Sequence, residues 1–457
     1  MLFVPLYLQG AAWQAGFGFE GWCTLALATP AWLQGFAGAI WVHSVAALPW
    51  VVLIVAAGFR LVEPELEEEA LLDGTPGQVF FHVTLPATIP AMGVALLWVA
   101  LVTAGEMTIT DLFAVRTYAE ELYTQLSLGE PPGQIARRLG PGILAVAAMV
   151  PAALAIVARL APAERPPSLL RPLVFRLGRW RIPCAAFVVA VLLLVVGVPL
   201  INLFYKAGIV VTETPIGRQR AWSLAKCLAL IAAAPIEYRR EWGWTILLGT
   251  LAATAAVGAG FALAWLGRRG GAGAWAVFLP AALCLALPGP LIGLGVIGLV
   301  NRPEVPGLVY LYDQSILAPW LALSVRALAP ATLLLWHGLR TIPAEILDAA
   351  ATDGAGPAAV LGRVAIPCRR RAIVLAWTVA LAVALGDLAA SILVVPPGVT
   401  TLSIRIFGLL HYGVDDRVAG VCLALAGVSA VVAWSASRLA RTWAAEAAGE
   451  LPGQGPG

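Results

Sequence analysis

The chain has 457 residues, and its composition excludes an ordinary soluble domain: 60% of the residues are apolar and 12% are charged, against roughly 45–50% and about 25% in soluble proteins. The net charge of +3 says little by itself, because the placement of basic residues sets orientation in a membrane, and no nucleic-acid partner is expected. The six cysteines form no close pair, which argues against a disulfide framework or a zinc site.

Apolar stretches recur along the whole chain, and each is long enough to cross a hydrocarbon core of about 30 Å as a helix of about 20 residues. The sequence therefore predicts an all-α, polytopic membrane protein surrounded by membrane lipid. Ten spans are predicted, near residues 2–17, 33–58, 88–110, 140–159, 183–204, 243–266, 274–299, 316–338, 372–395 and 418–437.

Arginine placement predicts which loops face the cytoplasm, because cytoplasmic loops are enriched in Lys and Arg. If the connection after the fourth span is cytoplasmic, most arginine clusters fall on that side when the spans are counted alternately. The exceptions would lie in an outer loop, for which an amphipathic surface segment is one interpretation: Arg218, Arg220, Arg239 and Arg240.

Polar positions reveal an internal duplication. Three sets of residues recur 280 positions later: Ser44-Val45 as Ser324-Val325, Arg60 as Arg340, and Asp73-Gly74 as Asp353-Gly354. After a one-residue insertion, Leu85-Pro86 matches Ile366-Pro367 and Gly105-Glu106 matches Gly386-Asp387. Transporters are often built from duplicated halves with the pathway between them, and both copies here are expected to share one membrane orientation.

This duplication predicts two homologous helical bundles: an N-terminal half at residues 1–160, a cytoplasmic linker at 161–182 and a C-terminal half at 183–457. The first two spans of the C-terminal half have no counterpart in the other half. Residues 1–17 instead resemble Leu287 to Ile297, which lie within the third span of the C-terminal half. We therefore expect about two helices to be absent from the first half, through either a misassigned start codon or a true ten-helix variant.

Two polar segments between spans, residues 64–74 and 343–354, share one local pattern. Each is predicted to be a short helix with a proline in its first turn, acidic residues near its positive end and a closing glycine able to adopt the left-handed conformation. Helices this short need a surface to pack against, and small side chains such as Ala351 would let one approach. A pair of ordinary cytoplasmic turns is the alternative.

The two segments resemble the EAA loops of ABC importer permeases, whose pattern is Glu-Ala-Ala, a glycine four residues later and then Leu-Pro. Glu69 replaces an alanine of the pattern and Asp348 replaces its glutamate. The resemblance implies a coupling helix in each half, seated on an ATPase subunit. The positions that it marks as ATPase-coupling are Glu67, Glu68, Ala70, Asp73, Gly74, Asp348, Ala349, Ala350, Asp353 and Gly354.

The same resemblance implies the partners: two ABC ATPase subunits, which would carry ATP and Mg, and a periplasmic or extracellular solute-binding protein. No cofactor is expected in this chain, which has no GxxxxGK[ST] phosphate loop, so it is predicted to be a transporter subunit and not an enzyme. No metal site is expected either, because none of the four histidines stands at ligand spacing from another histidine or a carboxylate: His43, His82, His337 and His411.

Residues 105–121, 386–402 and 409–413, together with the fused halves, resemble the iron(III) permease family of the binding-protein-dependent, type I importers. That resemblance implies a bacterial cytoplasmic (inner) membrane protein that imports iron(III). Thiamine, phosphonate, sulfate and polyamine are the alternative substrates within the same type of permease.

Four polar residues are candidates for lining the pathway. Glu106 and Thr110, and their repeat equivalents Asp387 and Ser391, are each predicted to lie four apart on one helix face. Carboxylates within spans are costly and usually face a protein interior or a wet cavity. The competing interpretation places all four at the outer interface, hydrogen-bonded to neighbouring loops.

Two other classes of membrane protein fit the sequence less well. A membrane-embedded enzyme would need a clustered catalytic constellation, and the sequence has none. An ion-coupled secondary transporter would show interrupted helices with charged midplane residues and no coupling motif. The twin EAA-like segments argue against the latter.

Overall fold

The computed structural model describes residues 3–131, 133–135, 137–142, 144–146, 148–149, 177–214 and 217–447. The first part comprises α1 (Leu6–Phe17), α2 (Trp22–Leu27), α3 (Gly35–Phe59), α4 (Pro64–Asp73), α5 (Pro76–Val79), the π-helical segment η1 (Phe80–Thr84), α6 (Leu85–Ala104), α7 (Thr108–Leu112) and α8 (Tyr118–Ser127). Of the predicted linker 161–182, residues 161–176 lie outside the described residues, as does the end of the predicted span 140–159.

The second part begins with η3 (Gly178–Trp180), α10 (Arg181–Leu192), η4 (Leu193–Gly197), α11 (Val198–Gly208), β1 (Ile209–Thr214), β2 (Gly217–Trp222), α12 (Leu224–Glu237), α13 (Arg239–Gly267), η5 (Gly271–Ala274), α14 (Trp275–Ala286) and α15 (Gly289–Val300). It continues with α16 (Pro306–Gln314), α17 (Leu317–Arg340), α18 (Ala344–Thr352), α19 (Pro357–Ala359), η6 (Val360–Ala365), α20 (Ile366–Cys368), α21 (Arg370–Gly386), α22 (Leu402–Leu410) and α23 (Asp416–Ala447).

Six helices in the described part of the chain are long and apolar enough to cross a membrane, or seven if one bent pair is a single span. The six are Gly35–Phe59, Pro76–Ala104, Gly178–Gly208, Arg239–Gly267, Leu317–Arg340 and Asp416–Trp443. They confirm the predictions near 33–58, 88–110, 183–204, 243–266, 316–338 and 418–437. The chain is a multi-pass membrane protein.

Three predicted spans have a different form. The span near 274–299 is broken into α14 and α15, which meet at 108°, because the extended Pro288 interrupts the helix. The span near 2–17 contains only the 12-residue α1. The span near 372–395 contains the 17-residue α21, which ends at Gly386 and is followed by turns. As straight spans, these three predictions were wrong.

The duplication is visible in the backbone. Of the three π-helical segments among the described residues, η1 and η6 stand at equivalent positions of the two copies, and each immediately precedes a residue-proline pair, Leu85-Pro86 or Ile366-Pro367. The third, η4, also precedes such a pair, Val198-Pro199, but lies outside the matched positions. The amides of Leu85 and Ile366 bond the carbonyl five residues back, since a proline ring crowds the carbonyl four residues before it. Likewise α1 and α15 both begin after an extended proline, Pro5 or Pro288.

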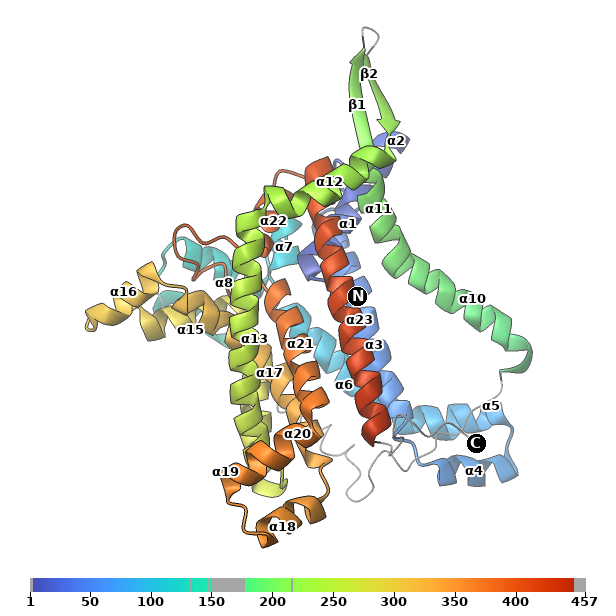
Figure 1. Ribbon diagram of the computed structural model, residues 1–457. Helices are drawn as coiled ribbons and strands as arrows, with labels where there is room; N and C mark the ends of the chain where they lie inside the picture. The colour runs from blue at the N-terminus through green and yellow to red at the C-terminus, as the bar shows by residue number, and fades with distance from the viewer. Residues whose placement is uncertain are drawn as a thin grey trace.

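The apolar packing repeats as well. One cluster in the first copy contains Trp13, Val42, Ile109 and Phe113. The equivalent positions of the second copy form a cluster of their own: Val296, Ala322, Ala390 and Val394. Around them, α13, α17 and α21 pack together, α3 packs on α6, and α23 packs on α11, α12 and α21 (Figure 1). A further cluster joins α1 to α11, α12, α22 and α23, so α1 is buried among helices of the second part.

The all-α prediction needs one correction within the described residues. The segment expected to be an outer loop forms a two-stranded antiparallel hairpin, with Ile209 paired to Trp222, followed by α12. Arg218 and Arg220 lie on β2, and Arg239 and Arg240 open α13. The hairpin projects from the end of the molecule opposite to α4 and α18 (Figure 1). The structure therefore has a hairpin end and a coupling-segment end.

Candidate functional site

The first coupling segment, α4, has the predicted N-terminus. Pro64 occupies its first position, and Glu65 and Glu67 lie in the first turn, where carboxylates are favourable near the positive end of a helix. Glu67, however, is only 4% exposed. Its Oε1 accepts a hydrogen bond of 2.6 Å from the Thr84 hydroxyl, at the end of η1. Glu67 therefore fastens α4 to the start of α6 and does not face a partner.

The second coupling segment, α18, begins after Pro343 with Glu345 in its first turn. Its attachment to the following span is apolar. Leu347, the repeat equivalent of Glu67, packs into a cluster that contains the buried Ala365, the equivalent of Thr84. The two copies thus join coupling segment to span at the same positions with different chemistry.

The glycines that close the two segments differ. Gly354 has φ +82, as a left-handed closing residue should. Gly74 is extended, with φ −141 and ψ 163, so the left-handed prediction was wrong there. Thr75 follows at once as the N-cap of α5, in a reciprocal capping box with Gln78. The shorter connection of the first copy passes directly into this cap.

Most of the predicted coupling residues lie on the surface. Exposed side chains are Glu68, Glu69, Asp73, Asp348, Ala349 and Asp353, with Gly354 also exposed and Ala70, Gly74 and Ala350 partly buried. Leu72 is 85% exposed on α4, and Ile346 is 45% exposed on α18. Each segment therefore presents at least one exposed large apolar side chain that a partner could bury.

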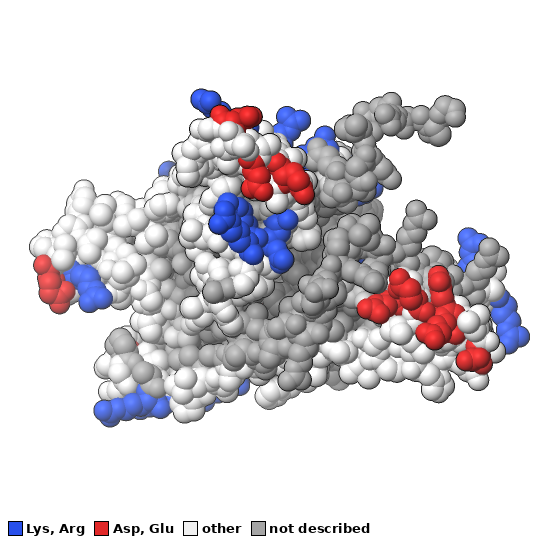
Figure 2. Space-filling model, turned by 90° about the horizontal axis from the view of Figure 1, so that it is seen from below, with Lys and Arg blue, Asp and Glu red and all other residues white. Residues whose placement is uncertain are grey.

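The two segments differ in charge. Exposed arginines at equivalent positions, Arg60 and Arg340, precede the two segments. After the first segment no Lys or Arg occurs before Arg116, whereas the exposed Arg363 follows the second. Seen from this end, Figure 2 includes a group of mainly acidic side chains at one side of the face and another in which acidic and basic side chains stand together. The surroundings of α4 are therefore mainly acidic, and those of α18 are mixed in charge.

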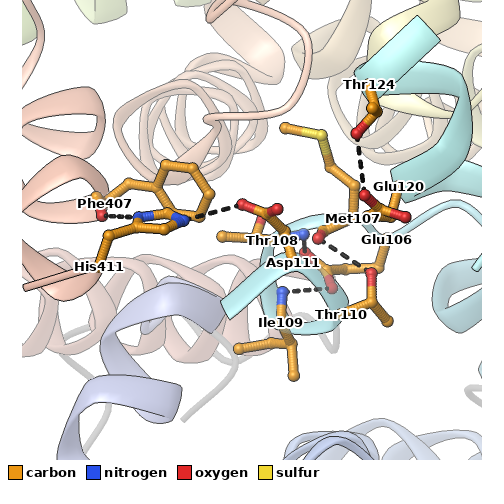
Figure 3. Close-up of polar contacts among 10 residues, drawn as sticks. All are labelled: Glu106, Met107, Thr108, Ile109, Thr110, Asp111, Glu120, Thr124, Phe407 and His411. Atoms are coloured by element: carbon orange, nitrogen blue, oxygen red, sulfur yellow. Dashed lines mark hydrogen bonds and ion pairs between the residues drawn. The ribbon is translucent and has the colours of Figure 1, made fainter. Parts of the chain in front are cut away.

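The candidate pathway residues of the first copy are not on one helix. Because α6 ends at Ala104, Glu106 lies in the turn before α7 and accepts hydrogen bonds from the amides of Thr108 (2.6 Å) and Ile109 (3.0 Å) (Figure 3). The Thr110 hydroxyl donates to the Met107 carbonyl at 3.0 Å. Glu106 thus acts as a cap at the positive end of α7.

The second copy repeats this turn. Asp387 follows the last residue of α21 and accepts from the Ala390 amide at 3.1 Å. The Ser391 hydroxyl donates to the Leu388 carbonyl at 3.2 Å. The helix-face prediction was wrong in both copies, because each helix ends before its carboxylate. The hydrogen bonds of Glu106 and Asp387 run to amides of their own turns, so the pathway role and the outer-interface alternative both stay predictions.

Each of these carboxylates has a basic neighbour that the sequence did not reveal. His43 Nε2 lies 3.6 Å from Glu106 Oε2, and Arg326 Nε lies 3.0 Å from Asp387 Oδ1. Both partners come from equivalent helices, α3 and α17, but from positions one turn apart: the equivalent of Arg326 is Ala46. Only knowledge of which helix faces each turn could have identified the pairs.

A further histidine pair joins the two copies. His411, the C-cap of α22, places Nε2 3.1 Å from Asp111 Oδ2 on α7, and its Nδ1 lies 2.9 Å from the Phe407 carbonyl oxygen (Figure 3). The hydrogen bond that His411 donates to the Asp111 carboxylate raises the pKa of the imidazole, and burial partly opposes this effect. Among the residues that the structure describes, no three His, Cys, Asp or Glu side chains gather as metal ligands would.

No family model matches the chain. Over 191 residues, 41% of its length, it is 28% identical to the putrescine transport system permease protein PotI of Escherichia coli K12, covering 64% of PotI. Over 104 residues, 23% of its length, it is 31% identical to PhnV of Salmonella paratyphi A, described as a putative 2-aminoethylphosphonate transport system permease protein, covering 39% of PhnV. The chain thus spans less than two thirds of these curated relatives, which are distant homologues among binding-protein-dependent ABC permeases.

Proposed function

We propose that this chain is the membrane-spanning permease subunit of a bacterial ABC importer, located in the cytoplasmic membrane and driven by two associated ATPase subunits. A solute-binding protein would deliver the substrate at the hairpin end. The observation that carries the proposal is the pair α4 and α18: two short helices at one end of the molecule, at matched positions of a repeat, each followed by a π-helical segment and then by a longer helix, α6 or α21.

This geometry suits the transmission of force. A short helix moves the longer helix that follows it only if the two are joined rigidly. Here Glu67 bonds Thr84 in one copy, and Leu347 packs against the apolar cluster that contains Ala365 in the other. Movement of the ATPase subunits would then tilt α6 and α21 together. ATP and delivered substrate must favour different states of the permease for such coupling to drive import.

The substrate belongs to the finer part of the proposal. The resemblance of residues 105–121 and 386–402 to iron(III) permeases supports iron(III) as the cargo. A small organic amine is the second candidate, because both similar proteins are named for the transport of amine-bearing compounds, putrescine and 2-aminoethylphosphonate. If the turns that hold Glu106 and Asp387 line the pathway, these two carboxylates would contact such a cargo.

Co-purification with the ATPase subunits in mild detergent tests the permease function. The variant Leu72→Ser with Ile346→Ser removes exposed apolar contacts from both coupling segments and is expected to weaken ATPase binding about tenfold. The control, Phe19→Ser with Ile236→Ser, removes two large apolar side chains that are at least as exposed on average (83% and 75%) near the hairpin end and should bind normally. Equal binding by both variants would overturn the assignment of α4 and α18.

Uptake by cells with and without the gene tests the cargo. Labelled iron(III), putrescine, 2-aminoethylphosphonate and thiamine should be measured in parallel. Selective loss of iron(III) uptake, restored by the intact gene, is the expected result. Loss of an amine instead would keep the permease function and replace the cargo.

A further inference from the structure

Two histidine–carboxylate pairs hold the short helix α7. Before its first residue, Glu106 caps the helix and lies beside His43 of α3. Within it, Asp111 contacts His411 at the end of α22 (Figure 3). The first pair lies within one copy of the repeat, whereas the second joins residue 111 of the first copy to residue 411 of the second.

The second copy has no equivalent link among the residues that the structure describes. The repeat position of Asp111 is the apolar Ile392, which packs against the apolar cluster around α1 and α22. The carboxylate of its turn, Asp387, is paired with an arginine whose charge is permanent. Of these two turns, only the one at α7 has histidine partners.

The surroundings of His411 favour its charged form on geometric grounds. Nδ1 faces the Phe407 carbonyl and Nε2 faces the Asp111 carboxylate, and both of these groups only accept hydrogen bonds. Neutral imidazole has a single N–H and can satisfy one of them, whereas imidazolium satisfies both. Loss of the proton therefore breaks one of the two contacts, and only the Asp111 contact crosses between the copies.

We propose that Asp111 and His411 form a proton-sensitive latch that keeps the hairpin end of the permease closed. The inference rests on the proposed importer function, in which this end must open to receive substrate. Both α7 and α22 lie toward the hairpin end, away from α4 and α18 (Figure 1). A bond between the copies stabilises the states in which α7 and α22 stay in contact, so in this proposal loss of the proton favours their separation.

The direction of the pH effect follows from linkage. Pairing with Asp111 raises the pKa of His411 above its ordinary value of 6.5. The charged pair is therefore complete below pH 6.5 and is lost as the pH rises through the raised pKa. The other ionisable groups near the pair are Tyr123 of α8, which burial keeps neutral by raising its pKa, and Glu20, which lies beside Gly413.

Distances between nitroxide labels on the full-length chain in lipid nanodiscs test the latch. In a cysteine-free background, one label replaces Leu128, 74% exposed after α8, and the other replaces Gly408 of α22, where an added side chain meets open space. Between about pH 5.5 and about pH 8.5, which bracket histidine titration, we expect the open fraction to rise about two- to fivefold, as suits a half-exposed ion pair.

His411→Gln and Asp111→Asn should each abolish this rise and leave the end as open at acid pH as the parent is at alkaline pH. The matched control is His82→Gln, which removes an exposed histidine bonded to the Gln78 carbonyl and should leave the rise intact. An unchanged pH response in His411→Gln would overturn the latch. The label distances are measured on the chain alone and do not depend on the ATPase subunits. Failure of ATPase co-purification would therefore overturn the proposed function, whereas an unchanged pH response in His411→Gln would overturn only the latch.

Discussion

The turn after α6 and the turn after α21 are the same structure built from different side chains. In both, a glycine ends the helix, a carboxylate accepts the next amides and a hydroxyl donates back to the residue after the carboxylate. The basic partner differs: His43 in one copy and Arg326 in the other, one turn apart. The comparison teaches that the backbone plan of the duplication follows the glycines and prolines, whereas the partners of buried carboxylates have diverged.

The largest expected effect is the difference in stability lost when Arg326 or His43 is replaced. Arg326→Ala leaves the Asp387 side chain, 4% exposed, without its counter-charge, and removal of one member of a buried pair costs about 3 kcal/mol. His43→Ala should cost about 1 kcal/mol, because a histidine 3.6 Å away contributes less and Glu106 keeps two amide donors. Unfolding by SDS in mixed micelles measures both free energies.

A double variant sharpens this result. Arg326→Met with Asp387→Asn removes both charges and should recover most of the stability lost in Arg326→Ala, because no uncompensated charge stays buried. If Arg326→Ala and His43→Ala cost the same, the two copies do not differ in the way that their geometry indicates.

The next effect concerns the joints of the coupling segments. Glu67→Ala leaves the Thr84 hydroxyl, 4% exposed as a residue, without its acceptor, at a cost of about 2 kcal/mol. Glu67→Leu with Thr84→Ala installs the chemistry of Leu347 and Ala365 in the first copy and should restore part of that loss. The measurement is protease resistance of α4 together with ATPase co-purification. A double variant no better than Glu67→Ala would show that the two joints are not interchangeable.

A third contrast uses the two closing glycines. Gly354→Ala forces an alanine to φ +82 and should destabilise the end of α18 by about 1 kcal/mol, although an added methyl group meets no neighbour. Gly74→Ala, at φ −141, should be nearly neutral. ATP-driven uptake should fall in the former and not in the latter. The opposite order would contradict the assigned backbone conformations.

Sequence patterns predicted the features that depend on neighbouring residues in the chain. Apolar length located six spans, and the proline, acidic residues and glycine located α4 and α18. The hairpin was missed although the β-branched run Ile209 to Thr212 precedes a proline and a glycine, a recognised strand and turn signal. The ends of α6 and α21 were missed because glycine is common inside membrane helices. The pairs of His43 and His411 depend on tertiary packing, which no spacing in the sequence encodes.

The smallest expected effect concerns the π-helical segments, in which the copies agree most closely. Pro86→Ala and Pro367→Ala each restore an amide and remove the ring that crowds the preceding turn, so η1 and η6 should relax toward α-helix. That change shortens the hydrogen-bonded repeat from five residues to four and rotates each coupling segment about the axis of its span. We expect stability to change by less than about 1 kcal/mol while ATP hydrolysis becomes less coupled to uptake. Equal loss of coupling in the two single variants would show that both copies use the π-helical turn in the same way. Loss of coupling in only one of the two variants would show that the copies have diverged at this position too, as they have in the basic partners of their carboxylates.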